Sequence, residues 1–352
     1  MTQQNRGSVT IPVIDGHNDL AWACRDKRDY SVAGLDSEAD SVISGLQTDV
    51  PKLRRGAVQA QFWSVWVHTD LAGAASVQAT LEQIDFVHRL VDAYPDDLQW
   101  AVTADDVDEA RAGGRIASLI GIEGGHQLNN SLGVLRQFAR AGARYLTLTW
   151  NSSTAWADAA VGEVRHDGLN DRGRDMIAEM NRIGMIVDLS HVSAATMRDA
   201  LDATALPLIF SHSSCFALNS HPRNVPDEIL LRLAENGGVQ MLTFVPSFIS
   251  AAFFAWEQAG SIGVAPTVTV ADVADHVEHA RRLAGIDHIG IGGDFDGCPE
   301  MPVGLATVAD YPNLFDELSA RGWTRPDLLK LGAQNVLRVL RAHDETYRRF
   351  TS

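Results

Sequence analysis

A histidine and an aspartate stand two residues apart near the start of the sequence, where the chain reads VIDGHNDL. In an extended backbone, residues i and i+2 lie on the same face, so His17 and Asp19 are expected to point in the same direction. An imidazole nitrogen and a carboxylate oxygen on one face can bind a metal ion together. Such a pair is also common as a hydrogen-bonded surface pair, so the metal interpretation depends on further ligands elsewhere.

Four further residues with ligand or acid-base chemistry follow short apolar runs. They are Glu123 in GIEGGH, His191 in DLSHVS, His212 in FSHSS and Asp294 in GGDFDG. Each has a structural alternative, because a histidine at a strand end is commonly a hydrogen-bonded group and an Asp-Phe-Asp-Gly segment can form a turn. Together, with a carboxylate between the histidines, they can bind two metal ions. Nitrogen and oxygen ligands of this kind suit zinc and leave room for water.

These residues follow a regular series of β-rich runs. The eight runs are VTIPVID, AQFWSVWV, ASLIGIEG, RYLTLTW, MIVDLSHV, PLIFSH, GVQMLTFV and HIGIGGDF. Amphipathic segments lie between them and end on helix stop signals, as at Gly184 and Gly285. Strands that alternate with helices predict parallel pairing, and eight such units close an α/β fold of the (β/α)8 TIM barrel type.

The whole chain, residues 1–352, is expected to form one barrel domain, because no linker or shift in composition divides it. The main irregularity is the segment from Pro246 to Thr267, which predicts an elaborated loop after the seventh run. In such barrels the chemistry gathers at the carboxyl ends of the strands. The candidate residues follow the first, third, fifth, sixth and eighth runs, so they are expected to meet at one rim.

Composition and charge exclude several classes of protein. Lys and Arg number 29 against 45 Asp and Glu, a net charge of −16 that argues against a nucleic-acid partner. The first ten residues lack the apolar core of a signal peptide, and no run reaches about 18 uninterrupted apolar residues. The three cysteines are widely spaced and predict no disulfide framework. We therefore expect a soluble, cytoplasmic protein that binds no membrane.

Other catalytic motifs do not fit. Gly290 and Gly292 resemble the start of a dinucleotide-binding fingerprint, but Phe295 occupies the third glycine position and acidic residues stand where the pyrophosphate would lie. The sequence contains no G-x-S-x-G elbow, no Walker loop and no C-x-x-C pair. These three classes of enzyme are set aside.

Along nearly its whole length the sequence resembles the membrane (renal) dipeptidase family, the M19 metallopeptidases of the amidohydrolase superfamily. The matching segments, in order, are DGHNDL, GAVQAQFWSVWV, GIEGGH, YLTLTWN with WAD close behind, GLNDRGRDMI, DLSHVS, FSHSS, PRNVPDE, GIGGDFDG and LLKLGAQNVLRVLR. Several of these segments are specific, and their order and spacing agree with the family. The resemblance implies a metallo-dipeptidase on a metal-dependent hydrolase barrel.

The resemblance also implies a role for each candidate residue. Two zinc ions per chain would be held by the five ligands His17, Asp19, Glu123, His191 and His212. The first two would bind one zinc and the two later histidines the other. The glutamate would bridge both metals, in place of the carboxylated lysine of many relatives.

Two further residues complete the machinery that the resemblance implies. Asp294 would be the proton shuttle when a metal-bridging hydroxide attacks the peptide bond. Arg223, in PRNVPDE, would form a salt bridge with the C-terminal carboxylate of a dipeptide, although a loop arginine can equally be solvated. Recognition of a free carboxylate implies a preference for dipeptides over longer chains, with L-Xaa-D-Xaa as well as L-Xaa-L-Xaa as candidate substrates.

The sequence departs from the family at the substrate pocket. Trp150 stands where many members have a histidine that contacts the substrate, and Val245 stands near the position of a tyrosine in several members. Specificity is therefore open, and Trp150 is a candidate substrate-binding residue. Two alternatives remain at this point: a binuclear amidohydrolase that acts on another amide, a lactone or a phosphoester, and a non-catalytic barrel used for binding. Base rates and the resemblance imply a homodimer.

Overall fold

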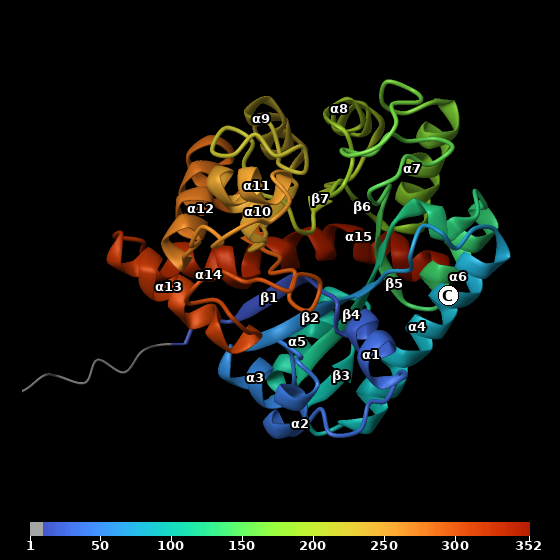
Figure 1. Cartoon of the computed structure of the whole chain (residues 1–352). Helices are drawn as coiled ribbons and strands as arrows, with labels where there is room; N and C mark the ends of the chain where they lie inside the picture. The colour runs from blue at the N-terminus through green and yellow to red at the C-terminus, as the bar shows by residue number, and fades with distance from the viewer. Residues whose placement is uncertain (1–9) are drawn as a thin grey trace, which may run out of the picture.

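Eight parallel strands close into a barrel in the computed structural model of the chain, which describes residues 10–352 (Figure 1). The barrel strands are β1 (Val13–Asn18), β2 (Val58–Val65), β4 (Ile116–Glu123), β5 (Ala143–Thr147), β6 (Ile186–Asp188), β7 (Ile209–Phe210), β8 (Val239–Leu242) and β9 (Ile289–Ile291). Neighbours in this order pair in parallel, and β9 pairs with β1 to close the ring. Each strand lies in or overlaps one predicted run, which confirms the (β/α)8 fold.

A ninth strand, β3 (Leu98–Trp100), was not among the predicted runs. It pairs with the first residues of β4, from Ile116 to Ser118, and β5 pairs with β4 only from Ile120 onward. The strand therefore extends the sheet beside the barrel without entering the ring. Three residues are too few to show an alternating pattern, which is why the sequence gives no signal for it.

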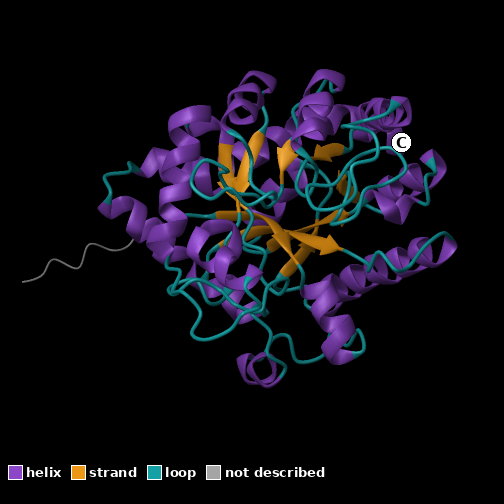
Figure 2. Ribbon diagram, turned by 45° about the horizontal axis from the view of Figure 1, so that its top comes forward, coloured by secondary structure: helices purple, strands orange, loops and turns teal. Residues whose placement is uncertain are grey.

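Helices surround the strands on the outside (Figure 2). They are α1 (Leu20–Arg28), α2 (Glu38–Ile43), α3 (Val50–Arg55), α4 (Ala74–Ala93), α5 (Ala104–Ala112), α6 (Leu132–Arg140), α7 (Asp171–Ile183), α8 (Ala194–Ala203), α9 (Asp227–Asn236), α10 (Pro246–Ile249), α11 (Ala251–Gln258), α12 (Val270–Ala284), α13 (Tyr311–Ala320), α14 (Arg325–Leu329) and α15 (Asn335–Thr351). The two predicted stop signals are confirmed, because α7 ends at Gly184 with φ 70° and α12 ends at Gly285 with φ 87°. The predicted loop after the seventh run contains two helices, α10 and α11.

The barrel interior is filled beneath the carboxyl ends of the strands. A Cβ atom at Gly121 would overlap the ring of Tyr145, and one at Gly16 would meet the sulfur of Met241 at 2.3 Å. The two glycines therefore give these large side chains room inside the barrel. The hydroxyl of Tyr145 donates to the carbonyl of Gly16 at 3.1 Å, one residue before His17. This packing fixes the end of β1, from which the first candidate ligands project.

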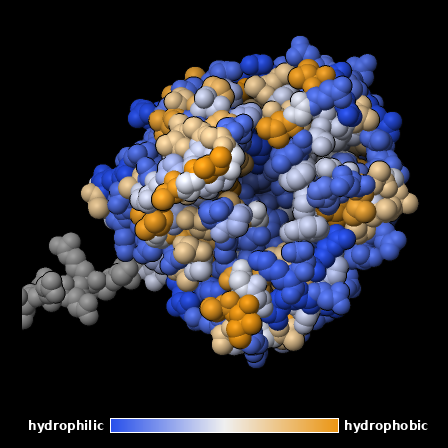
Figure 3. Space-filling model, in the orientation of Figure 1, coloured by the Kyte–Doolittle hydropathy of each residue, from blue (hydrophilic) through white to orange (hydrophobic). Residues whose placement is uncertain are grey.

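The surface shown in Figure 3 is mostly hydrophilic, with a hollow near its middle and apolar side chains gathered in separate patches. Among residues 10–352, none of the helices combines the length and the apolar character that crossing a membrane requires. Cys24 and Cys215 are buried free thiols, and Cys298 is a half-buried one. The three thiols are therefore unpaired, as the wide spacing of the cysteines predicted.

Candidate metal centre

The five predicted metal ligands come together at the carboxyl end of the barrel. Their ligand-bearing side chains are buried and come from the ends of β1, β4, β6 and β7: His17, Asp19, Glu123, His191 and His212. Candidate ligand atoms of His17, Glu123 and His212 all lie within 4.8 Å of one another. Residues separated by almost 200 positions in the sequence therefore form one cluster.

Glu123 lies between two groups of ligands. Its Oε2 lies 3.5 Å from Nε2 of His17, and that nitrogen lies 3.3 Å from Oδ2 of Asp19. Its Oε1 lies 2.9 Å from Nε2 of His191 and 3.6 Å from Nε2 of His212. One carboxylate oxygen thus faces His17 and the other faces His191 and His212, an arrangement in which a carboxylate could bridge two cations.

The imidazole nitrogens in the centre fit a metal ion. Nε2 of His17 is buried and has no hydrogen-bond partner among the described residues. Nε2 of His191 and Nε2 of His212 face each other at 2.9 Å. Buried nitrogen lone pairs directed at one space beside carboxylates are costly without a cation. The residues present therefore fit a bound metal cation.

The other ring nitrogen of each histidine has its own acceptor. Nδ1 of His17 lies 3.1 Å from the hydroxyl of Tyr145, and Nδ1 of His191 lies 2.9 Å from Oδ1 of Asn151. Nδ1 of His212 lies 2.8 Å from Oγ of Ser211. A proton on Nδ1 leaves the lone pair on Nε2, as metal-binding histidines require.

Asp188 contacts His212 indirectly, through Ser211. Its Oδ2 accepts hydrogen bonds from Oγ of Ser211 at 2.6 Å and from Oγ1 of Thr147 at 2.5 Å. Because the serine proton is committed to Asp188, the serine oxygen is free to accept from the histidine. Sequence reasoning missed Asp188, Tyr145 and Asn151, although the aspartate in DLSHVS ends a strand and was a visible signal.

Burial and neighbouring charges set the protonation states of the centre. Burial and the positive charge of Arg223 lower the pKa of His191 to about 3. Burial, with His17 and Arg223 nearby, also holds the pKa of His212 well below its usual value. Burial opposes ionisation of Glu123, but His17 and His191 hold its pKa well below the usual range. These two neutral imidazoles and the carboxylate are in the forms that bind a cation.

Asp294 follows β9 and faces the same centre. Its backbone is in the left-handed region, with φ 63°, and its amide donates to the carbonyl of His17 at 3.2 Å. Its Oδ1 lies 3.9 Å from Nε2 of His17. A Cβ atom at Gly297 would meet Oδ2 of Asp19 at 2.2 Å and Oδ1 of Asp294 at 2.6 Å, so a glycine is needed there. The turn thus presents Asp294 to the ligands.

Arg223 is buried, with 2% of its surface exposed, so it is not a solvated loop arginine. Its guanidinium makes two long hydrogen bonds. Nη1 donates to Oγ of Ser213 at 3.4 Å, and Nη2 donates to the carbonyl of His212 at 3.5 Å. Within residues 10–352, Nε of Arg223 has no hydrogen-bond partner and no carboxylate lies within 4.0 Å of the guanidinium. Burial lowers the pKa of Arg223 only to about 10, so it remains charged near neutral pH.

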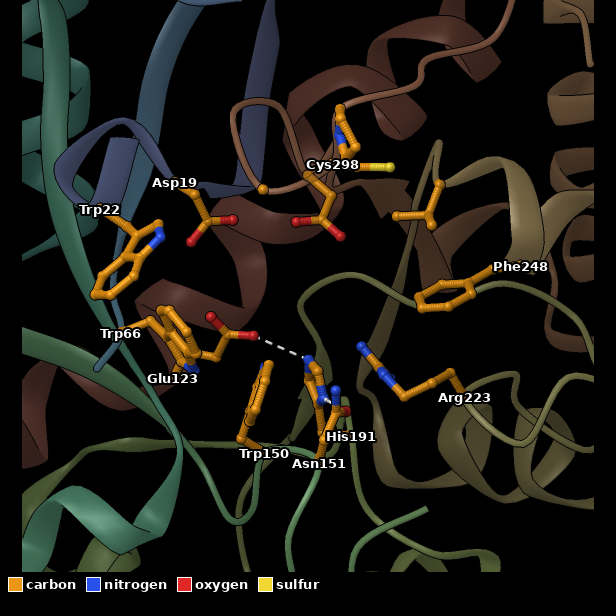
Figure 4. A pocket seen from close by; sticks show the side chains of 14 residues that line it. Asp19, Trp22, Trp66, Glu123, Trp150, Asn151, His191, Arg223, Phe248 and Cys298 are labelled. Carbon is orange, nitrogen blue, oxygen red and sulfur yellow. Dashed lines mark hydrogen bonds and ion pairs between the residues drawn. The ribbon is translucent and has the colours of Figure 1, made fainter. Parts of the chain in front are cut away.

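A cavity of about 290 Å³ joins these residues (Figure 4). Six of the eight predicted site residues line it: Asp19, Glu123, Trp150, His191, Arg223 and Asp294. Trp150 packs against Trp66 with ring centroids 4.8 Å apart, and Trp66 packs against Trp22 at 4.4 Å. The three indoles form one wall, and Arg223 and Phe248 lie across the cavity from it.

Comparison with known proteins agrees with this geometry. The family model for membrane dipeptidase (peptidase family M19) matches residues 1–352. A solved dipeptidase of family M19, dipeptidase AC, is 25% identical, with a TM-score of 0.83 over 95% of this chain and 99% of its own. An amidohydrolase from Pseudomonas aeruginosa is also 25% identical, with a TM-score of 0.76 over 95% and 96% of the two chains.

A third solved structure, a metallopeptidase from Rhodobacter sphaeroides liganded with a phosphinate mimic of the dipeptide L-Ala-D-Ala, shares the fold. It is 24% identical, with a TM-score of 0.83 over 95% of this chain and 99% of its own. The match of the family model over the full length, together with the buried cluster of histidines and carboxylates, decides the assignment. The chain belongs to the membrane dipeptidase family, peptidase family M19, and is a metal-dependent hydrolase that acts on dipeptides.

Proposed function

We propose that this dipeptidase uses two zinc ions and acts on dipeptides with a free C-terminal carboxylate. The observation that carries the proposal is the buried guanidinium of Arg223, which faces the cavity beside the metal ligands without a carboxylate partner among the described residues. A buried charge without a partner is costly, and a substrate carboxylate would supply the missing counter-ion. The planar guanidinium of Arg223 can donate two parallel hydrogen bonds to such a carboxylate.

Two zinc ions are proposed because Glu123 presents one oxygen to each group of ligands. His17 and Asp19 would complete one site. His191 and His212 would complete the other. Zinc bound there would supply a nucleophilic water near neutral pH and would polarise the scissile carbonyl as a Lewis acid.

Asp294 is proposed to move the proton during hydrolysis. Burial raises the pKa of its carboxyl well above the usual value, and the nearby carboxylates of Asp19 and Glu123 add to this effect. A raised pKa makes the carboxylate a stronger base toward the attacking water. The carboxylate of Asp294 would accept a proton from the attacking water and then deliver it to the nitrogen of the leaving amine.

The size of the cavity supports short substrates of this kind. Its volume of about 290 Å³ lies just below the roughly 300–1,000 Å³ typical of ligand sites. A carboxylate bound at Arg223 would mark the end of the substrate, because further residues would have to replace that carboxylate with an uncharged amide. We therefore propose dipeptides, with either configuration at the second residue, as the substrate class.

Arg223→Met is expected to raise KM for free dipeptides by about 100- to 1,000-fold, because two charge-assisted hydrogen bonds are lost. C-terminally amidated dipeptides should lose less than about tenfold, since they never use the full fork. Steady-state kinetics on matched pairs of free and amidated dipeptides measure the difference. The thermal midpoint should not fall, because the substitution removes an unpaired buried charge.

Arg223→Lys is the matched control, because it keeps the charge and loses the two-pronged geometry. Its KM for free dipeptides is expected to lie between those of the wild type and Arg223→Met. Equal losses on free and amidated dipeptides would argue against carboxylate recognition. Such a result would favour a substrate without a carboxylate, such as another amide, a lactone or a phosphoester.

Trp150 is proposed to set the shape of the substrate pocket. Its indole packs between Trp66 and the ring of His191, whose centroid lies 6.1 Å from that of Trp150. Trp150→His replaces this wide ring by a smaller one with a different hydrogen-bonding edge. The expected result is a changed rank order of small and bulky dipeptides, measured as kcat/KM in both stereochemical series. Zinc content is expected to stay the same, and an unchanged rank order would remove Trp150 from specificity.

A further inference from the structure

We propose that Asn151 uses the two ends of its amide for different tasks at the metal centre. Its Oδ1 holds the ring of His191, and its Nδ2 donates a hydrogen bond to the carbonyl oxygen of the peptide bond that is cleaved. The second task rests on the function proposed above. The first task concerns only the metal ligands of this chain.

The oxygen end is assigned by the hydrogen bond to His191. Nδ1 of His191 lies 2.9 Å from Oδ1 of Asn151, so the ring donates from Nδ1 and carries its lone pair on Nε2. Nε2 is the nitrogen that lies 2.9 Å from Oε1 of Glu123. The opposite orientation of the amide would place a donor against Nδ1 and a proton on Nε2, where the metal would bind. The amide therefore selects the metal-binding tautomer.

The nitrogen end is free to act on a substrate. Asn151 is exposed and lines the cavity, and its Nδ2 makes no hydrogen bond to any residue from 10 to 352. Figure 4 shows Asn151 beside His191, on the side of the ring nearer Arg223. An amide donor whose oxygen is already committed has a fixed direction, and that fixed direction is what stabilisation of a developing negative charge requires.

The segment that carries Asn151 is held in place on both sides. Oγ1 of Thr149 donates to the carbonyl of His191 at 3.1 Å, and the amide of Ala160 donates to the same carbonyl at 2.7 Å. Oγ of Ser153 donates to the carbonyl of Glu163 at 2.6 Å. The side chain of Asn151 therefore projects from a segment anchored to the backbone of the metal ligand that it contacts.

The other neutral N–H donors on residues that line the cavity are the indole nitrogens of Trp22 and Trp150, on the wall opposite Arg223. Asp19, Glu123 and Asp294 offer carboxylates, and Nε1 of Trp66 is fully buried. With the substrate carboxylate on Arg223, the scissile carbonyl belongs to the preceding residue, whose Cα lies about 3.8 Å further along the chain. That short step keeps the carbonyl close to Arg223, on the side of the cavity where Asn151 lies.

Asn151→Asp separates the two tasks, because the carboxylate keeps an acceptor for His191 and loses the donor. We expect kcat to fall about 100- to 1,000-fold, as for the loss of one oxyanion donor, with KM changed less than about tenfold. Metal affinity, measured by competition with a chelator on the apoprotein, should stay within a few-fold of the wild type. Asn151→Ala loses both ends, so its metal affinity should fall about 10- to 100-fold as well.

Ser152→Asp is the matched control for the added charge. Ser152 is exposed, is next in the chain and does not line the cavity, so this variant should keep a kcat within a few-fold of the wild type. Dissociation constants of a phosphinate dipeptide analogue, whose tetrahedral oxygens imitate the attacked carbonyl, give a second readout. Asn151→Asp should bind the analogue at least 100-fold more weakly, and Ser152→Asp should bind it almost as tightly as the wild type.

Each outcome decides part of the proposal. Wild-type kcat and analogue binding in Asn151→Asp overturn the donor role, and wild-type metal affinity in Asn151→Ala overturns the positioning role. A similar loss in Ser152→Asp assigns the effect to charge and also overturns the donor role. If the metal-loaded wild type neither cleaves dipeptides nor binds the analogue, the proposed function and the donor role fail together. Metal affinity then still decides the positioning role.

Discussion

Asp294→Asn is expected to lower kcat for dipeptides by about 10²- to 10⁴-fold, the usual contribution of general acid-base catalysis. The amide keeps the size and polarity of the carboxylate but cannot accept the proton of the attacking water. Because the substrate would still bind at Arg223 and the five predicted metal ligands are unchanged, KM should change little. Metal content per chain, measured by elemental analysis, should equal that of the wild type.

Asp296→Asn is the matched control for this prediction. Asp296 lies two residues further along the same turn, also has a left-handed backbone, with φ 66°, and does not line the cavity. Its Oδ1 accepts the amide of Gln47 at 2.8 Å, which an asparagine oxygen can still do. We expect kcat within about threefold of the wild type, because the amide is isosteric with the carboxylate and the changed oxygen does not face the metal ligands. A similar fall in both variants would attribute the effect to the turn and not to proton transfer.

The loss in Asp294→Asn should also change the dependence of the rate on pH. Burial raises the pKa of Asp294, so protonation at falling pH should remove the base and lower the wild-type rate on the acid side of the profile. The variant has no carboxylate at position 294 to protonate, so its residual rate should decrease less steeply as the pH falls. If the variant keeps the full decrease in rate at low pH, that decrease must be due to another titrating group.

The sequence was sufficient to predict the barrel and the candidate ligands that gather at its rim, because both follow from local patterns. Short β-rich runs predicted all eight barrel strands. Residues that can bind a metal follow several of these runs, which placed them at the carboxyl end of the barrel that parallel strands share. His17 and Asp19 were visible from their spacing alone. A position of Glu123 between the histidines was expected from the strand order, but which ligands belong to which metal was implied only by the family resemblance, since distances between strand ends are not encoded in a local pattern.

Burial and direction of side chains could not be predicted in the same way. PRNVPDE has the composition of a loop, which allowed Arg223 to be solvated, yet the structure buries it at the cavity. His191 and Asp294 have left-handed backbones, with φ 69° and 63°, and nothing in their neighbouring residues requires this. Asn151 followed a predicted strand and carried no signal, because its role depends on which face of the loop meets His191.

Glu123→Ala is expected to abolish measurable turnover and to lower the metal content of both sites together. Oε2 of Glu123 lies 3.5 Å from Nε2 of His17, and Oε1 lies 2.9 Å from Nε2 of His191. The alanine variant removes a ligand from each site and the negative charge that lies between two cations. Wild-type protein purified without a chelator should contain close to two zinc ions per chain, and the variant should contain well below one.

Two further variants test whether the loss is due to bridging. Ser64→Ala removes only the hydrogen bond that Oγ of Ser64 donates to Oε2 of Glu123 at 3.1 Å, so it should keep both metals and most of the activity. His212→Ala removes a ligand from one proposed site, so it should leave close to one zinc ion per chain. If Glu123→Ala also leaves one zinc, the carboxylate belongs to a single site. A joint loss in Glu123→Ala beside a single loss in His212→Ala would indicate that Glu123, unlike His212, is a ligand of both sites.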